Sequence, residues 1–477
     1  MDVGQRALSG LKWNAGARLA GQVLNWAVTL VVIRLLAPED YGLMSMTIVF
    51  VAFLGIFSDL GLGLSVVQSR DLDEQLLRKI YGMVLVSHVA LFALLFFSAP
   101  LVAAFFGDPE LVPLVQVIST QFALSAVSWI PGAMLRRELR FRALSVIEFV
   151  SFAASALATL VLALAGAGVW ALVLGSMAKV FSRIILLNAV SRVRFKPSFD
   201  FRGLGGALSF GGLSTLNGVL WHLFSQIDAL IVGKIAGKEA LGVYTVAMHL
   251  ASLPLSKVLS VVQPIAFPAF ARLQHDLPRV AGAVLRGIRA MMVMAFPMFF
   301  GLSAVAPELV AVLLGPKWEA ARFPLQVLPL VMPIRMIAGL VTPAVNGIGR
   351  IDVVVRNTAT AFAVMAVGFA VGSHWGVIGV SLAWLALYPL VMTFNFKRSL
   401  AVLTLTRMDI LRAMLRPLAA ALLMYLMIAA ARATLPAHLP ALLQLCTLVA
   451  VGAVTYAVAT LAFNRDDLRA LLRLARG

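Results

Sequence analysis

Residues 28–59 read VTLVVIRLLAPEDYGLMSMTIVFVAFLGIFSD, two apolar runs separated by the polar turn Ala37-Pro38-Glu39-Asp40. Each run extends to roughly the 20 mostly apolar residues that a helix needs to cross the hydrocarbon core of a membrane. No small-x-small cleavage site ends the first run, so we interpret it as a retained span and not as a signal peptide. The stretch predicts two membrane helices joined by a short connection.

The same pattern continues along the 477 residues. We expect about 14 transmembrane helices, with 12 as the competing count because the gaps at 165–168 and 373–376 are very short. The expected spans are 11–36, 42–66, 80–105, 113–135, 143–165, 168–190, 207–232, 241–267, 281–306, 324–346, 353–373, 376–396, 415–432 and 440–463.

Composition agrees with an all-α polytopic membrane protein. Hydrophobic residues make up 61% of the chain, charged residues 13%, and the mean hydropathy is +0.96. Soluble domains are about 45–50% apolar and about 25% charged, so the excess apolar surface must face lipid. The single cysteine, Cys446, excludes an internal disulfide framework.

The net charge of +18 invites a nucleic-acid function, but the position of the charges argues against it. With the N-terminus in the cytoplasm, most of the 39 Lys and Arg residues fall in the cytoplasmic connections, as the positive-inside rule requires. We therefore predict a bacterial inner-membrane protein with both termini cytoplasmic and no nucleic-acid partner. Six basic residues fall on the outer side: Arg34, Lys234, Lys238, Lys317, Arg322 and Arg432.

An internal repeat at an offset of 200 organises the chain. Leu30, Glu39 and Gly42 return as Leu230, Glu239 and Gly242, and Arg34 returns as Lys234. The repeat predicts two parallel six-helix lobes at 1–200 and 201–400, followed by a helix pair and basic tail at 401–477. Repeated lobes with a central cavity are typical of transporters that work by alternating access.

Polar side chains follow one face of several spans, and such faces must meet a cavity or another helix. The span at 241–267 carries serines and Gln263 at helical spacing. The first span contributes Asn14, Arg18, Gln22, Asn25 and Thr29. Its repeat partner contributes Ser214, Asn217, Trp221, Ser225 and Asp228.

Ionisable residues within spans are costly to insert and are therefore functional candidates. Arg335 lies where Pro329 and Pro333 could open the helix, and Lys257 lies between two other prolines. Lys179 and Arg183 share one helix face, and Glu148 is expected to pair with Arg142 or a neighbour. The candidates for substrate binding are Arg18, Gln22, Asn25, Lys179, Asn217, Lys257 and Arg335. The candidates for ion coupling, or for pairing with a cation, are Asp59 and Asp228.

The excess of cations suits an anionic substrate such as a pyrophosphate. The sequence contains no phosphate-binding lysine loop, no metal-ligand spacing and no nucleophile motif, so we predict no enzyme activity, cofactor or metal.

Several motifs resemble the Wzx-type polysaccharide flippases of the multidrug/oligosaccharidyl-lipid/polysaccharide exporter superfamily, in particular the colanic-acid and xanthan type. The resemblance covers essentially the whole chain. Its motifs are Gly10-Leu11-Lys12-Trp13, the turn at 34–42, Phe57-Ser58-Asp59-Leu60-Gly61-Leu62-Gly63, Gln226-Ile227-Asp228 with Gly233, and Glu239-Ala240-Leu241-Gly242-Val243-Tyr244.

The resemblance implies that an undecaprenyl-pyrophosphate-linked oligosaccharide moves from the cytoplasmic to the periplasmic leaflet, with its sugar in the cavity and its tail in lipid. It also implies that Arg18 contacts the pyrophosphate, and it admits a polysaccharide polymerase and a chain-length regulator as partners. Three alternatives remain: a cation-coupled multidrug exporter, a peptidoglycan-precursor flippase and a membrane scaffold of a polysaccharide-synthesis complex.

Overall fold

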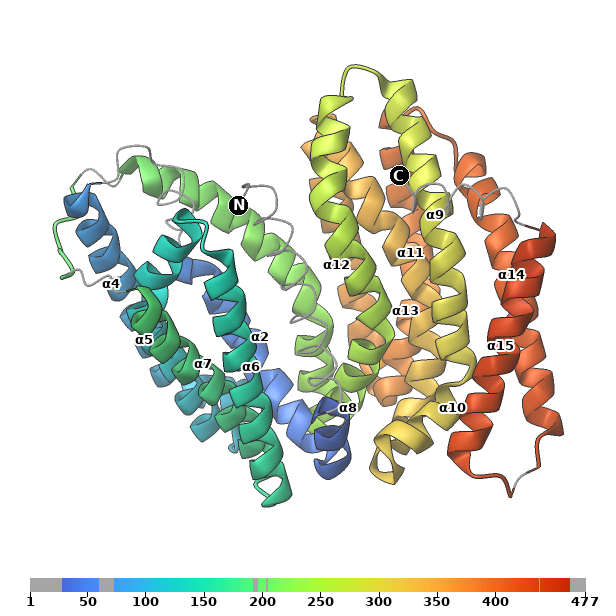
Figure 1. The fold of residues 1–477 in the computed structure, drawn as a ribbon, viewed down its shortest axis with the longest axis horizontal. Helices are drawn as coiled ribbons and strands as arrows, with labels where there is room; N and C mark the ends of the chain where they lie inside the picture. Colours follow the sequence, from blue (N-terminus) through green and yellow to red (C-terminus); the bar gives the residue numbers. More distant parts are fainter. Residues whose placement is uncertain (1–27, 60–72, 192–195, 203–204, 437, 464–477) are drawn as a thin grey trace, which may run out of the picture. The chain divides into compact units, whose positions relative to one another are not determined.

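The computed structural model describes residues 28–59, 73–191, 196–202, 205–436 and 438–463, and its regular secondary structure in these ranges is helical throughout (Figure 1). The chain divides into two compact units, Met1–Gly242 and Val243–Gly477. Eleven helical segments of the described ranges are long and apolar enough to cross a membrane. The protein is therefore a multi-pass helical membrane protein.

In the first unit, α2 contacts α4, α5 and α7. α4 packs on α5, and α7 contacts both α5 and α6. Residues 28–35 are also helical. The helices of this unit are α2 (Pro38–Asp59), α4 (Glu74–Phe106), α5 (Leu111–Arg137), α6 (Phe141–Leu164), α7 (Val169–Ser191) and the first part of α8 (Gly205–Arg272).

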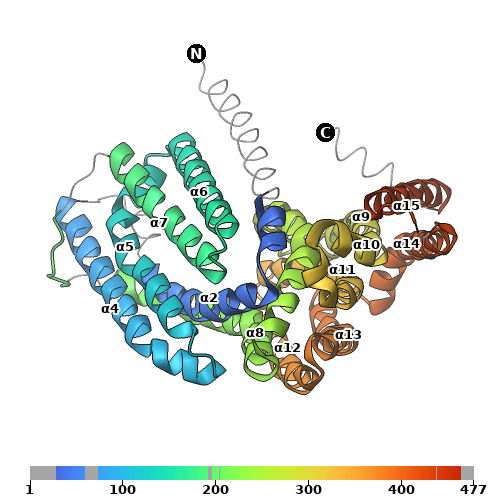
Figure 2. The same cartoon turned by 90° about the horizontal axis from the view of Figure 1, so that it is seen from below.

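In the second unit, α11 contacts α9, α12 and α13. The last two helices, α14 and α15, lie side by side and α14 packs on α9 (Figure 2). The elements that follow α8 are α9 (Leu277–Ala304), α10 (Ala306–Leu309), the π-helix η1 (Val310–Leu314), the 3₁₀-helix η2 (Pro316–Ala321), α11 (Arg322–Gly347), α12 (Ile351–Gly372), the 3₁₀-turn η3 (Ser373–Trp375), α13 (Gly376–Val402), α14 (Arg407–Thr434) and α15 (Ala441–Phe463).

Each expected span from 80–105 onward coincides with helix in the structure, and so does the described part of 42–66, which ends at Asp59. The expected spans 207–232 and 241–267 both lie in α8, with the non-helical Gly237 between them. The first span lies mostly outside the described residues, so the count of 14 stays a prediction, as do the lobe boundaries at 200 and 400. The two shortest gaps are real helix breaks. Gly166 and Gly168 have φ of 75° and 56°, and Gly376 has φ of 60°, backbone angles that glycine adopts without steric cost.

Helix α4 shows how the local sequence sets an element. Asp73 caps its N-terminus by accepting a hydrogen bond from the backbone N–H of Leu76, and Gly107 ends the helix in the left-handed conformation. Near the C-terminal end of α4, the side chains of Phe97 and Leu101 are 77% and 71% exposed. Such large apolar surface is stable in contact with lipid hydrocarbon and not with water.

The two copies of the repeated turn touch each other within the first unit. A methyl group added to Gly42 would overlap the carbonyl oxygen of Lys238, and one added to Gly242 would overlap the carbonyl oxygen of Pro38. The contact is reciprocal because positions 38 and 42 correspond to 238 and 242 at the offset of 200. Only glycine allows the two backbones to approach this closely.

Connections expected on the same side of the membrane also contact each other. On the predicted outer side, Lys238 forms ion pairs with Asp108 at 3.0 Å and Glu110 at 3.2 Å. On the predicted cytoplasmic side, Lys79 pairs with Asp200 at 2.8 Å, and the hydrogen bond from Lys79 holds the pKa of Asp200 below its ordinary value. These contacts agree with the predicted alternation of the connections, whereas the absolute orientation stays a prediction.

Candidate functional site

Arg335 lies half-buried in the middle of α11. The helix continues without a break through Pro329 and Pro333, and both prolines are buried. The expectation that these prolines open the helix is therefore wrong, because neighbouring helices pack around them and hold the segment helical. Arg335 is presented by a continuous helix and not by an unwound segment.

The Arg335 guanidinium lies over the indole ring of Trp384, with its central carbon 5.0 Å from the ring centroid. Its Nη1 also approaches the sulfur atoms of Met248 at 3.8 Å and Met332 at 4.0 Å. A cation over an indole face is attracted by the ring quadrupole, and more strongly where water is excluded. These contacts position the guanidinium, but they leave its N–H groups without a strong hydrogen bond, because thioether sulfur is a weak acceptor.

Trp384 is held by three aromatic neighbours in the second unit. Its Nε1–H donates to the hydroxyl of Tyr244 at 2.8 Å, so the buried indole is satisfied. Its ring centroid lies 5.3 Å from that of Phe369 and 5.2 Å from that of Tyr388. Aromatic side chains of α8, α12 and α13 thus form a packed cluster, called the aromatic floor below, against which Arg335 lies. We call Arg335, Trp384 and Tyr244 the Arg335 site.

Within the described residues, no carboxylate forms an ion pair with Arg335. A guanidinium carries five N–H donors in a planar fork and stays charged at any relevant pH. A cation of this kind inside a membrane protein is costly unless an anion, water or backbone acceptor satisfies it. The chemistry of the site therefore favours a bidentate anion such as a phosphate.

Lys257 is exposed and lies in the second part of α8. Two residues further, Leu259 packs against Gly339 of α11. Because residues two apart lie on roughly opposite sides of a helix, Lys257 points away from α11 and from Arg335. The structure does not bring these two candidates into one site.

The polar face around Lys257 is largely satisfied by its own helix. The hydroxyls of Ser252, Ser256 and Ser260 each donate to the backbone carbonyl three residues earlier. His249 and Gln263 on the same face are exposed. Among the described residues, the side-chain amide of Gln263 and the imidazole of His249 form no hydrogen bond with another side chain, so this face of α8 is a polar surface.

Lys179 and Arg183 do share one face of α7, as their spacing indicated. Lys179 Nζ lies 5.2 Å from the ring centroid of Phe152, and Arg183 pairs with Glu148 at 2.8 Å. Phe152 and Glu148 are likewise four residues apart on α6, so successive turns of α6 and α7 contact each other. Glu148 is a structural ion-pair partner, as expected, but it pairs with Arg183 of α7 and not with Arg142.

Asp228 is half-buried in α8, where one carboxylate oxygen accepts the backbone N–H of Ala229 at 2.8 Å. Asp59 is the last described residue of α2 and Asn217 lies within α8, but the side chains of both are outside the described part. Arg18, Gln22 and Asn25 lie in residues 1–27, also outside the described part. Their roles stay predictions.

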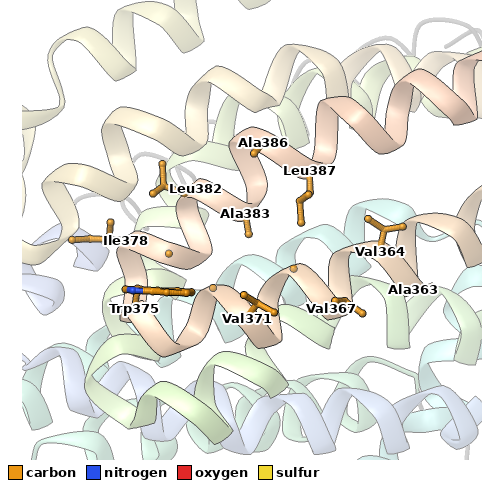
Figure 3. A pocket seen from close by; sticks show the side chains of 13 residues that line it. Ala363, Val364, Val367, Val371, Trp375, Ile378, Leu382, Ala383, Ala386 and Leu387 are labelled. Carbon is orange, nitrogen blue, oxygen red and sulfur yellow. The ribbon is translucent and has the colours of Figure 1, made fainter.

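An apolar groove of about 870 Å³ lies between α12 and α13 (Figure 3). Gly368 and Ala383 line it, whereas the adjacent residues Phe369 and Trp384 are not among its lining residues. The side chains drawn in Figure 3 are apolar apart from the indole nitrogen of Trp375. The groove suits a hydrocarbon chain and offers no charge to a headgroup.

Sequence reasoning missed two features of this unit. One is the Tyr244–Trp384 hydrogen bond, and the other is the ion pair of Arg432 with the buried Glu308 at 2.7 Å. Helical spacing of Trp384 and Tyr388 was a visible signal for an aromatic face, but its partner helix could not be identified from it. In the described ranges, no three His, Cys, Asp or Glu side chains are close enough together to hold a metal ion.

Comparison with known proteins identifies the family. The sequence profile described as "Polysaccharide biosynthesis protein" matches residues 31–322, more than half of the chain. The chain belongs to this family. The matched range includes both copies of the repeated turn.

Proteins with related sequences come from several bacteria. The succinoglycan biosynthesis transport protein ExoT of Rhizobium meliloti is 28% identical, and the match covers 97% of this chain and 94% of ExoT. The lipopolysaccharide biosynthesis protein WzxC of Escherichia coli is 24% identical over 81% of this chain and 79% of WzxC. The teichuronic acid biosynthesis protein TuaB of Bacillus subtilis is 27% identical, with 70% of each chain covered.

Two solved structures share the fold of this family member. The lipid II flippase MurJ in an inward closed conformation gives a TM-score of 0.69 at 15% identity, covering 95% of this chain and 99% of MurJ. An inward-facing multidrug resistance transporter of the MATE family gives a TM-score of 0.61 at 15% identity, covering 80% and 95%. Both similarities concern the fold alone.

Proposed function

We propose that this family member translocates a lipid-linked oligosaccharide across the bacterial inner membrane, from the cytoplasmic to the periplasmic leaflet, for polysaccharide synthesis. The headgroup would be a polyprenyl pyrophosphate. The related proteins named above serve polysaccharide biosynthesis or transport, and the structural relatives include a flippase of a lipid-linked precursor. The orientation with both termini in the cytoplasm belongs to the same proposal.

The observation that carries the proposal is the Arg335 site. It places a permanent cation within an apolar helix bundle and fixes it against an aromatic cluster, and most of its donors meet no acceptor among the described residues. A pyrophosphate has the charge and the paired oxygens that such a fork binds. Binding there would offset the cost of moving the headgroup through the bilayer, while the tail stays in hydrocarbon.

The alternative of a multidrug exporter for organic cations fits the described charges less well. Such a transporter needs an accessible carboxylate in its cavity. Two described acids, Glu148 of α6 and Glu308 of the short helix α10, are already paired with arginines. Asp59 and Asp228 remain candidates for ion coupling, and Arg18, Gln22, Asn25, Lys179, Asn217 and Lys257 remain candidates for substrate contact.

The test is transport of a fluorescent polyprenyl-pyrophosphate oligosaccharide in proteoliposomes, measured by the fraction of label reached by an impermeant quencher. Arg335→Ala removes charged hydrogen bonds of about 1.5–3 kcal/mol each and is expected to slow transport by about tenfold to a hundredfold. Arg335→Lys keeps the charge but loses the planar fork, so an intermediate rate is expected.

The matched control is Arg350→Ala. Arg350 follows the same helix but is exposed and pairs with Asp352 at 3.0 Å. Its removal should leave transport within about twofold of the unaltered protein, since exposed ion pairs contribute little. Transport at the unaltered rate by Arg335→Ala, at equal amounts of protein, would exclude Arg335 as the headgroup contact.

A further inference from the structure

A second groove, of about 450 Å³, lies in the first unit at the N-terminal end of α6. Two arginines, Arg140 and Arg142, stand at its mouth. The rest of the lining is aliphatic and comes from both α6 and α7: Ala143, Val146, Ile147, Val150, Leu186 and Val190. The groove thus combines a cationic end with an apolar length.

The turn that enters the groove has the composition of a membrane interface. Leu139 adopts a left-handed backbone conformation with φ of 54°, unusual for a residue with a branched side chain. Leu139 and Phe141 are 71% and 54% exposed and alternate with the two arginines. Apolar side chains beside cations at a helix end are stable where headgroups meet hydrocarbon.

The charges around the groove are unbalanced. Arg142 has no ionic or hydrogen-bonded partner among the described residues. Arg140 approaches Glu138 only at 3.8 Å, with both side chains nearly half exposed. Glu148, which lies on α6 among the lining residues, already forms an ion pair with Arg183 at 2.8 Å. The mouth of the groove therefore attracts an anion.

We propose that this groove binds an anionic phospholipid, with its phosphate on Arg140 and Arg142 and part of an acyl chain between α6 and α7. Basic pockets between membrane helices are sites of this kind for acidic lipids. The lining from Ala143 to Val150 spans about 10 Å along the helix, the length of part of one acyl chain. The turn lies on the predicted cytoplasmic side, and none of its residues belongs to the Arg335 site.

A bound phospholipid is favoured over the polyprenyl tail of a transported substrate. The two arginines lie at the end of their helix, so they hold a phosphate at the membrane surface. A translocated headgroup must instead leave the surface. The site is therefore expected to retain lipid permanently and to act on the stability of α6 and α7, independently of transport.

Native mass spectrometry of the purified full chain tests the proposal, with phosphatidylglycerol or cardiolipin compared with phosphatidylcholine of the same acyl chains. The unaltered protein should retain the anionic lipids about tenfold better, as expected for charged hydrogen bonds to a phosphate. The double variant Arg140→Gln/Arg142→Gln should lose this preference. Val146→Trp, which fills the groove at an exposed position, should lose retention although both arginines remain.

The control is Arg407→Gln/Arg416→Gln, which removes the same charge from two exposed arginines of α14 on the same predicted side. It should bind anionic lipid as the unaltered protein does. Equal retention by Arg140→Gln/Arg142→Gln and the unaltered protein would overturn the proposal, and so would an equal loss in the control. Displacement of phosphatidylglycerol by undecaprenyl phosphate at equimolar concentration would overturn it as well, by assigning the groove to substrate.

Discussion

Lys179 in the first unit and Arg335 in the second are both cations placed over an aromatic ring at nearly the same distance, 5.2 Å and 5.0 Å. Their surroundings differ. Phe152 under Lys179 is 38% exposed, whereas Trp384 under Arg335 is 6% exposed and is hydrogen-bonded to Tyr244. The same contact is thus loosely held in one unit and fixed in the other.

The ion pairs of the two units differ in the same way. Arg183 and Glu148 pair between side chains that are 35% and 49% exposed, through one contact. Arg432 binds Glu308 through two nitrogens, at 2.7 Å each, and Glu308 is only 8% exposed. Arg432 also donates to the carbonyl of Ala304, which ties α14 to the end of α9. The Arg432–Glu308 pair is therefore held more firmly than the Arg183–Glu148 pair, which lies mostly at the surface.

The largest difference is expected from removing one acid of each pair. Glu308→Ala leaves the half-exposed Arg432 without its bidentate partner and should lower the free energy of unfolding by about 1.5–3 kcal/mol, the value of hydrogen bonds to a charged group. Glu148→Ala should lower it by about 1 kcal/mol or less. Thermal unfolding in one detergent, compared between the two variants, measures the difference. Equal losses would show that burial of Glu308 does not strengthen its pair.

A smaller difference is expected from removing the rings. Trp384→Leu loses the ring contact with Arg335, which for a desolvated pair is worth about 2 kcal/mol, and should also slow transport. Phe152→Leu should cost about 0.5–1 kcal/mol, since Lys179 and its ring are partly exposed. The quencher assay and thermal unfolding report the two effects. Transport unaffected by Trp384→Leu would mean that Arg335 needs no aromatic floor.

The smallest expected effect is the coupling energy of Arg183 and Glu148, obtained from a double-mutant cycle with both residues changed to Gln. We expect about 0.2–1 kcal/mol, decreasing with added salt because exposed pairs are screened. Thermal unfolding at low and high salt gives this value. A coupling above 2 kcal/mol that is insensitive to salt would place the pair in a much less exposed environment than the structure gives it.

The sequence was sufficient for the long apolar helices of the described residues, because a membrane helix is encoded by a local run of apolar side chains. It did not predict the short elements α10, η1 and η2. It also predicted that Lys179 and Arg183 share a face, since helical spacing is local. It failed for Glu148, whose partner is 35 residues away, and for Trp384, whose hydroxyl partner is 140 residues away. Spacing along one helix says nothing about which neighbour faces it.

Prolines show a second limit of local reasoning. Pro329 and Pro333 remove backbone donors from α11, and a local argument predicts an opening. The helix is nevertheless continuous, because packing of α9, α12 and α13 against α11 outweighs the lost hydrogen bonds. Tertiary contacts decide such positions.

The reciprocal contact of Gly42 with Lys238 and of Gly242 with Pro38 has the form of an isologous interface, in which residue i touches j and residue j touches i. If the offset of 200 records a gene duplication, a half-length ancestor could have paired with a second copy of itself through this turn. Fusion would then have made permanent an association that began as a homodimer. Gly42 and Gly242 would then both descend from one ancestral glycine, which had to be small because it met the backbone of the second copy.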